Sequence, residues 1–120
     1  MIVLSLPYPP TSNHNTMVAN GRRISSPKYR AWRTLAELEA RAARQLSVAG
    51  PYHIQYRVDR PDRRRRDIEN LPKSLSDALQ AAGIIEDDAH CETSFVAWTE
   101  RKPGKGARVH ITIIPYGVEP

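Results

Sequence analysis

Strict alternation in one short stretch restricts the possible folds of this chain more than any other feature. In YHIQYRVD, residues 52–59, apolar and polar side chains follow each other without a break; the apolar positions are Tyr52, Ile54, Tyr56 and Val58. A period of two is typical of a β-strand with one buried face, because successive side chains point to opposite sides. The Gly-Pro pair just before it ends whatever element precedes. The fold must therefore contain a sheet with a covered face.

Two segments with helical spacing are available to cover that face. The first begins after Ser25 or Ser26, either of which can cap a helix that has Pro27 in its first turn. Its apolar residues recur every three to four positions and are Trp32, Leu35, Ala36, Ala42, Ala43 and Leu46. This spacing predicts an amphipathic helix that ends before the Gly-Pro pair.

The second helix follows a highly charged stretch and has signals at both ends. Its apolar residues are Leu71, Leu75, Ala78, Leu79 and Ala82. Proline costs about 3 kcal/mol inside a helix but is tolerated in the first turn, so Pro72 predicts a start near 69–71. Gly83 is expected to close the helix in a left-handed conformation.

The rest of the chain predicts three more strands and one long loop. Strands are expected at 2–6, around 93–100 and around 107–114, the last two joined as a hairpin through RKPGKG. The polar residues 11–28 show no period and predict a surface loop. The order β-α-β-α-β-β predicts an α+β fold, a single domain over residues 1–120 with a mixed β-sheet of about four strands and two helices packed on it.

Net charge points to the class of partner. The chain has 18 Lys and Arg against 13 Asp and Glu, a formal net charge of +5. Such a domain is expected to bind a polyanion, above all nucleic acid, although charge alone does not separate DNA from RNA or a membrane surface. No stretch is long and apolar enough for a membrane span or a secretory signal, so we expect a soluble, cytoplasmic protein without membrane contact. The lone Cys91 predicts neither a disulfide nor a cysteine metal site.

The stretch RRRRDIENLPK carries the densest charge pattern. The planar fork of arginine suits phosphate, and such contacts supply affinity with little base specificity. Adjacent side chains of an extended segment point to opposite sides, so about half of the run can face one ligand strand. Two further arginines follow Gly21. The predicted phosphate contacts are Arg22, Arg23, Arg63, Arg64, Arg65 and Arg66.

Acidic residues flank the second helix at both ends. Asp67 and Glu69 lie at its start, and Asp87 and Asp88 just beyond its end. If the last strands fold back beside the middle strand, the two pairs could meet. Carboxylates brought together need a proton or a cation, and hard oxygen ligands suit Mg²⁺ or Mn²⁺, which favours metal-assisted phosphodiester chemistry. Lys73, one turn after Glu69, could hold that carboxylate or touch the phosphate.

Each of these patterns also has a purely structural interpretation. Acids at a helix start often cap it, a basic run is often only solvated, and the Asp87-Asp88 pair could be an ordinary turn. A lone turn histidine such as His90 is more often without a special role. Trp32 and Trp98 fit core packing better than base stacking.

The ordered string PDRRRRDIENLPKSLSDALQAAGIIEDDAH resembles the signature of the RusA family of Holliday-junction resolvases, in which an Arg-rich turn precedes D-x-D-N-x-x-K and a later D-D pair. The opening LPYPPTSN is similar to the family's L-P-W-P-P-S-x-N, so the resemblance covers essentially the whole chain. It implies a Mg²⁺-dependent endonuclease, with Mn²⁺ as a substitute, and no small-molecule cofactor. It also implies a homodimer on four-way junction DNA, because two matching sites suit two symmetric strands.

The resemblance further implies roles for individual residues. Asp67, Glu69 and Asp88 would be catalytic Mg²⁺ ligands, with Asp87 as the weaker candidate of its pair. Lys73 would be an essential base or phosphate contact. Glu69 departs from the family pattern, which has aspartate there; it keeps the carboxylate and lengthens its reach.

The expected function is nicking of paired strands of Holliday junctions by metal-assisted hydrolysis, in recombination and repair. Family members are often carried by prophages. Asn13 and Asn70, which match the asparagines of the two motifs, join the expected DNA-binding residues. Two alternatives remain, a non-catalytic DNA-binding protein that kept the fold and an unrelated metal-dependent RNase.

Overall fold

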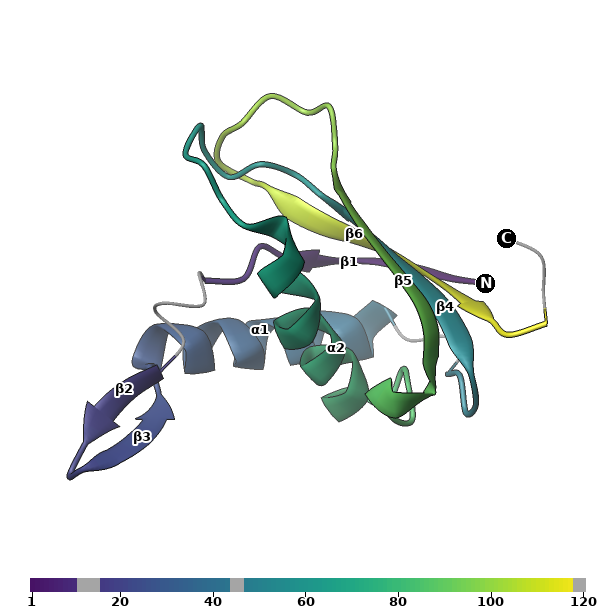
Figure 1. The fold of residues 1–120 in the computed structure, drawn as a ribbon, viewed down its shortest axis with the longest axis horizontal. Helices are drawn as coiled ribbons and strands as arrows, with labels where there is room; N and C mark the ends of the chain where they lie inside the picture. Colours follow the sequence, from purple (N-terminus) through teal and green to yellow (C-terminus); the bar gives the residue numbers. More distant parts are fainter. Residues whose placement is uncertain (11–15, 44–46, 118–120) are drawn as a thin grey trace.

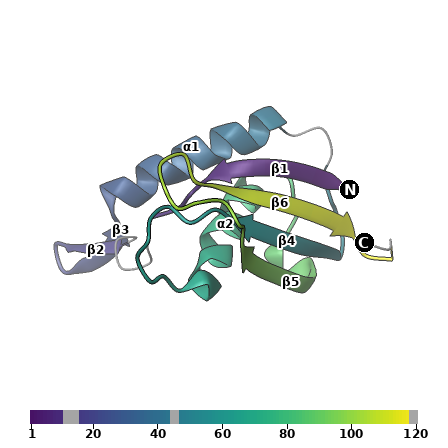
Figure 2. The same ribbon diagram turned by 90° about the horizontal axis from the view of Figure 1, so that it is seen from above.

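A mixed sheet of four strands forms the centre of the fold (Figure 1). The computed structural model describes residues 1–10, 16–43 and 47–117, and only the backbone of residues 16–19 and 22–24. The strands lie side by side in the order β1, β6, β4, β5 (Figure 2). β4 is parallel to β5 and antiparallel to β6, which is antiparallel to β1. Their bounds are Ile2–Pro7 for β1, Tyr52–Val58 for β4, Cys91–Trp98 for β5 and Arg108–Pro115 for β6.

The alternation in residues 52–59 is confirmed by β4. Its four apolar residues are all buried, while His53, Gln55 and Arg57 between them are half-buried or exposed. Both helices lie on one side of the sheet (Figure 1), and the buried residues of the strands face them. The predicted α+β fold is confirmed.

The predicted hairpin of the last two strands is wrong. β5 pairs with β4, and β6 lies between β1 and β4. The apolar pattern accounts for the difference. β6 buries Val109, Ile111 and Ile113 and is bonded on both sides, whereas β5 is mostly exposed and occupies the edge. β6 therefore lies inside the sheet and β5 at its edge, and the connection 99–107 passes the end of β4 to reach β6.

Part of the predicted loop 11–28 is also wrong. β2 (Thr16–Ala19) and β3 (Arg22–Ser25) form a separate antiparallel hairpin. Asn20 has φ 52° and Gly21 has φ 73°. Positive φ at both central residues is typical of the two-residue type I′ turn, which matches the twist of paired strands and favours Asn-Gly. The Asn-Gly dipeptide was the signal in the sequence for this hairpin.

Helix α1 (Pro27–Ala43) begins where the sequence predicts. The Ser26 hydroxyl accepts a hydrogen bond from the Tyr29 backbone N–H at 3.1 Å, which confirms Ser26 as the cap. The buried stripe is narrower than expected: Trp32, Ala36 and Ala40 are buried, at spacings of four. Leu35 and Ala42 are exposed because they lie about 100° or more around the helix from the middle of that stripe. Ala43 lies on the same face as the stripe but is exposed as the last residue of the helix, and Leu46 lies outside the described residues.

Helix α2 (Leu71–Ala81) follows a short 3₁₀ turn, η2 (Ile68–Asn70), so the predicted start near 69–71 is confirmed. Pro72 lies in the first turn. Gly83 has φ 78°, and the N–H of Ile84 donates to the carbonyl of Leu79 at 3.0 Å, the bond of a Schellman cap. The five apolar residues named above for this helix are all buried. α2 lies in the connection between the parallel strands β4 and β5, which cannot be joined by a short hairpin turn.

Candidate active site and nucleic-acid surface

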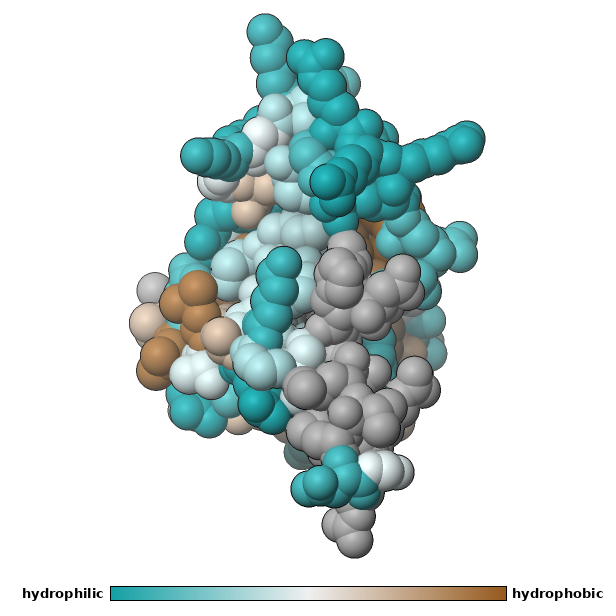
Figure 3. All heavy atoms as spheres, turned by 90° about the vertical axis from the view of Figure 1, so that its left-hand side faces the viewer, coloured by the Kyte–Doolittle hydropathy of each residue, from teal (hydrophilic) through white to brown (hydrophobic). Residues whose placement is uncertain are grey.

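Two basic loops lie side by side beyond one end of the sheet (Figures 1 and 2). One is 59–67, after β4, and the other is 99–107, between β5 and β6. The Gly104 N–H donates to the Arg60 carbonyl at 3.2 Å and joins them. Long hydrophilic side chains gather at this end of the molecule (Figure 3). Sequence analysis identified the first loop as a phosphate-binding element but not the second, whose cations are Arg101, Lys102 and Lys105.

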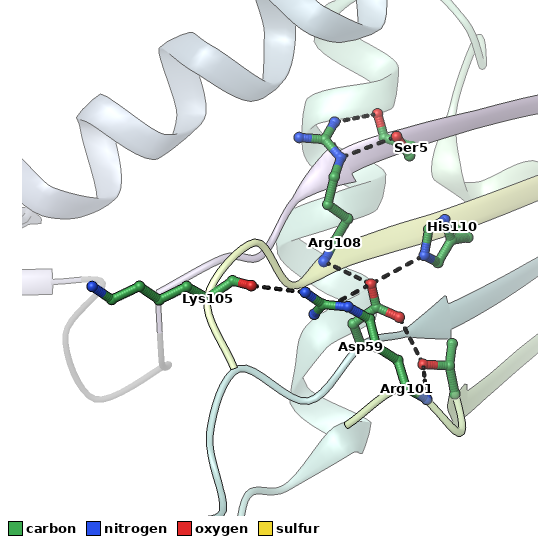
Figure 4. A network of polar contacts seen from close by, with 7 residues as sticks. Ser5, Asp59, Arg101, Lys105, Arg108 and His110 are labelled. Carbon is green, nitrogen blue, oxygen red and sulfur yellow. Dashed lines mark hydrogen bonds and ion pairs between the residues drawn. The ribbon is translucent and has the colours of Figure 1, made fainter. Parts of the chain in front are cut away.

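A buried carboxylate connects the ends of both loops at the point where they leave the sheet (Figure 4). Asp59, only 4% exposed, accepts hydrogen bonds from the Thr99 hydroxyl at 2.6 Å and the Arg108 backbone N–H at 3.1 Å. His110 Nε2 lies 3.2 Å from the same carboxylate, and Arg101 Nη1 lies 4.0 Å from it. Burial acts to raise the pKa of Asp59, but these hydrogen bonds outweigh it and lower the pKa below the ordinary value. The sequence interpretation, which placed Asp59 on the polar face of the strand, missed this role.

The four consecutive arginines have two different environments. Arg66 is turned inward and makes a forked ion pair with Asp62, with its Nη2 at 2.6 Å and its Nε at 3.2 Å from the two carboxylate oxygens. That pairing lowers the pKa of Asp62. The side chains of Arg63, Arg64 and Arg65 are exposed. Three of the four guanidinium groups are thus open to a ligand, and Arg66 is positioned in advance.

Asp67 caps the turn that begins the second helix. One of its carboxylate oxygens accepts the Glu69 backbone N–H at 3.0 Å and the other accepts Asn70 Nδ2 at 3.0 Å. Glu69 is exposed, and within the described part of the chain its carboxylate has no hydrogen bond or ion pair. Asn70 is therefore engaged with Asp67, and Glu69 points to solvent.

Lys73 connects the second helix with the later acidic pair. Its Nζ lies 3.0 Å from Asp77 and 3.2 Å from Asp88 Oδ2. Hydrogen bonds that the Lys73 ammonium donates to these two carboxylates, Asp77 first, raise the pKa of Lys73. Asp88 also has its backbone N–H bonded to Gln80 Oε1 at 3.2 Å. Asp87 caps its own short turn by accepting the Ala89 N–H at 2.9 Å.

The structure brings together some of the predicted site residues and not others. Asp88 contacts Lys73 of α2, a pairing that the sequence did not predict. Within the described ranges, however, no three or more His, Cys, Asp or Glu side chains are close enough to form a metal site. His90 lies 3.1 Å from Glu86 rather than facing the acidic pair. Of the remaining predicted contacts, Asn13 and the side chains of Arg22 and Arg23 lie outside what the structure describes.

The donor set itself fits a hard divalent cation in kind. Asp67, Glu69 and Asp88 offer only carboxylate oxygens, the ligands that Mg²⁺ prefers. Asp88 already has a cation, the Lys73 ammonium, against one of its oxygens. None of the three carboxylates is buried, so each remains accessible to an ion from solvent.

A small hollow of about 210 Å³ lies beside Lys73 and Asp88. Tyr52, Tyr56 and Cys91 line its inner side. Burial, the largest influence, raises the pKa of Tyr52 to about 12 and also raises the pKa of Tyr56 and of the Cys91 thiol. All three are therefore protonated at neutral pH, so Cys91 is no ready nucleophile.

Known proteins resemble this chain over nearly its whole length. The family described as Endodeoxyribonuclease RusA matches residues 7–114. The crossover junction endodeoxyribonuclease RusA of Escherichia coli K12 is 35% identical over 117 residues, which are 97% of this chain and 96% of that protein. Proteins of the same name from Shigella sonnei and Enterobacteria phage 82 are each 34% identical over the same shares. Among the described residues, no helix has the length and apolar character needed to cross a membrane.

Proposed function

This chain belongs to the RusA family of endodeoxyribonucleases, and from that membership we propose that it is a Mg²⁺-dependent nuclease that nicks paired strands of four-way DNA junctions. Its relatives carry the name crossover junction endodeoxyribonuclease, including one from a phage. The match extends over nearly the full length of both chains, so the loops that carry charge are included in it.

One observation carries the proposal. The Lys73–Asp88 contact joins the start of α2 to the turn before β5, and so gathers residues 15 positions apart into one site. The Arg-rich loop leads directly into that site through Asp67. Arginines that attract a phosphate backbone thus directly precede, in the chain, the first of the carboxylates proposed to bind a cation.

Asp67, Glu69 and Asp88 are the residues proposed to hold the metal, and Mg²⁺ is the ion proposed, with Mn²⁺ as a substitute. A divalent cation bound there would supply charge stabilisation at the phosphate and lower the pKa of a bound water. Asp87 is the less suitable member of its pair, because one of its oxygens is engaged in capping.

Lys73 is proposed to act as a cation and not as a base. Its pKa is raised by Asp77 and Asp88, so the amine is protonated at neutral pH and has no lone pair to accept a proton. An ammonium 3.2 Å from a metal-binding carboxylate can contact the phosphate or orient Asp88. Of the two roles that the family resemblance implies for Lys73, an essential base or a phosphate contact, the phosphate contact is therefore the one proposed.

The proposed DNA contacts are the exposed arginines of the 59–67 loop, with Arg22 and Arg23 as a second element. A homodimer is also proposed, because two identical sites related by a two-fold axis suit the two symmetric strands of a junction. Asn13 and Asn70 remain proposed contacts; Asn70 would have to exchange its bond to Asp67 for one to DNA.

The test is junction cleavage by wild type, Asp67→Asn and Asp88→Asn, with and without Mg²⁺. We expect wild type to nick junctions only with Mg²⁺ and both variants to lose nicking while they bind the junction as tightly or more tightly, because a negative charge is removed. Glu86→Gln removes a nearby exposed acid outside the site and serves as the matched control. A wild type that binds junctions but leaves them intact would favour a non-catalytic binding protein, and Mg²⁺-dependent cleavage of single-stranded RNA alone would favour an RNase.

A further inference from the structure

A groove of about 630 Å³ opens beside the arginine loop. Its walls are the turn 7–10 after β1, the first turns of α1, and the tips of the two basic loops. This volume is within the range of about 300–1,000 Å³ found for sites that hold small organic groups. Arg66 lines the groove, and the next residue, Asp67, is a proposed metal ligand. The groove is therefore a neighbour of the proposed active site and separate from the hollow at Lys73.

The inner surface of the groove is apolar and aromatic. Tyr8 and Trp32 contribute rings, and the Trp32 indole N–H donates to the Pro7 carbonyl at 3.0 Å, which holds the ring against the turn. Leu35 also lines the groove and is 49% exposed, although it lies on a helix that buries its neighbour Ala36 completely. Prolines make the turn rigid. The result is a fixed apolar surface, of the kind on which a planar ring can stack.

The rim of the groove is positively charged. Lys28, Arg64, Arg66 and Lys105 line it, and among the described residues no Asp or Glu does. The Arg66 guanidinium lies 5.9 Å from the Tyr8 ring centroid, held there by its pair with Asp62. Cations around an aromatic floor match the two parts of a nucleotide, since the base can stack while the phosphate meets the rim. An uncharged peptide or lipid chain would leave these four cations without a role.

We propose that this groove binds one unstacked nucleotide of the DNA strand, with its base on Tyr8 and Leu35, which the buried Trp32 supports from behind, and its phosphate at the cationic rim. The inference rests on the proposed junction nuclease function and adds a binding site to it. Bases inside a continuous duplex are stacked and cannot reach such a surface unless they leave the helix, at a cost of a few kcal/mol that is least where stacking is already interrupted. At a branch point strands change partners, so a base there is the natural occupant. The groove would thereby favour junctions over linear duplex.

A charge placed on the floor of the groove tests the proposal, with a matched control on the same helix. Leu35→Glu puts a carboxylate in the groove, where it repels phosphate and prevents stacking. Leu38→Glu makes the same change three residues later, at a side chain that is 59% exposed and does not line the groove. Leu35→Ser and Leu38→Ser replace this pair if circular dichroism shows that a glutamate variant is unfolded.

Two DNA pairs report on the base itself. The first is a four-way junction with abasic sites at the branch point, compared with one that has abasic sites inside its arms. The second is a thymidine tetranucleotide, compared with its abasic form. We expect loss of the branch-point base, or of the tetranucleotide bases, to weaken binding by wild type and Leu38→Glu about fivefold or more. Leu35→Glu should bind all of these probes more weakly and should not respond to base removal.

The outcomes separate the possibilities. The proposal that the groove binds a nucleotide is overturned if removing the base weakens binding equally in wild type, Leu35→Glu and Leu38→Glu. It is also overturned if removing the base changes binding in none of the three proteins. A shift to a smaller sedimenting species in Leu35→Glu alone also overturns it and makes the groove a contact between two copies of the chain. Mg²⁺-dependent nicking of the intact junction by wild type is measured in parallel. If wild type does not nick the junction, the nuclease proposal fails, and this result does not depend on how the proteins bind the abasic DNA.

Discussion

Replacing Asp59 by alanine removes the acceptor that joins the ends of three strands. Its carboxylate receives the Thr99 hydroxyl after β5 and the Arg108 N–H and His110 imidazole of β6, while Asp59 itself follows β4. The same contacts hold both basic loops in place where they join the strands of the sheet. We therefore expect the variant to lose both stability and affinity for DNA, although no cationic side chain has been removed.

The size of the effect follows from the contacts. A hydrogen bond to a charged group contributes about 1.5–3 kcal/mol. Asp59→Ala leaves the Thr99 hydroxyl and the Arg108 N–H without this acceptor, so the free energy of unfolding should fall by about 3–6 kcal/mol. Asp59→Asn keeps one acceptor oxygen but turns an NH₂ group toward one of the two donors, and should cost about 1–3 kcal/mol. Either loss is a large part of the roughly 5–15 kcal/mol of a typical domain.

Urea unfolding at neutral pH, followed by circular dichroism, measures these losses. Asp62→Ala is the control, because Asp62 also accepts several hydrogen bonds but lies at the surface, and its removal should cost much less. A loss below about 1 kcal/mol for Asp59→Ala would refute the argument, since two partly buried donors would then have lost a buried charged acceptor at almost no cost.

The pH dependence gives an independent check of the same carboxylate. The pKa of Asp59 is lower in the folded protein than in the unfolded chain. Its contribution to stability is therefore fully present above the unfolded value of about 3.9 and is lost as the pH falls through the folded pKa. The stability difference between wild type and Asp59→Asn should stay constant near neutral pH and shrink below about pH 4.

Two further predictions concern the proposed site. Glu69→Gln should abolish nicking but change the free energy of unfolding by no more than about 0.5 kcal/mol, because the carboxylate is exposed and without a partner in the described residues. Glu69→Asp should keep substantial nicking activity. A glutamine variant that still nicks junctions with ordinary Mg²⁺ dependence would show that Glu69 is not part of the site. Arg64→Gln should weaken binding to junction and duplex alike and reduce the slope of log affinity against log salt by about one, whereas an unchanged slope would show that this exposed side chain is only solvated. Arg66→Gln should reduce the slope similarly and also release Asp62.

The sequence alone determined the elements whose signals are local. Alternation over 52–59 specified β4 and its buried face, Ser26 and Pro72 specified where the helices begin, and Gly83 specified where the second ends. Each signal depends on residues within one or two turns of each other, so chain order contains the needed information. The β2–β3 hairpin belongs to the same group, because Asn20-Gly21 is a local turn signal that sequence analysis overlooked.

The candidate site could be predicted from the sequence only where it depends on local signals. Asp67 at the helix start and the arginines before it follow directly from chain order. That the Asp87-Asp88 pair would lie near the start of the second helix was only a possibility, since it depends on where β5 lies relative to α2, and the contact of Asp88 with Lys73 was not predicted. The capping bonds of Asp67 and Asp87 show that two of the acids also have the structural roles that the alternative interpretation assigned to them.

Strand order, the role of Asp59 and the groove were decided by tertiary structure alone. β6 lies inside the sheet because burying its isoleucines against both helices outweighs the shorter closure of a β5–β6 hairpin, and no local pattern compares those two free energies. Because the connection 99–107 passes the end of β4 to reach β6, it lies against the 59–67 loop, and Asp59 is enclosed between the two loops. The groove depends on the same connection, because its walls come from four segments of the chain, the turn 7–10, the first turns of α1 and the two basic loops, that only the folded structure brings together.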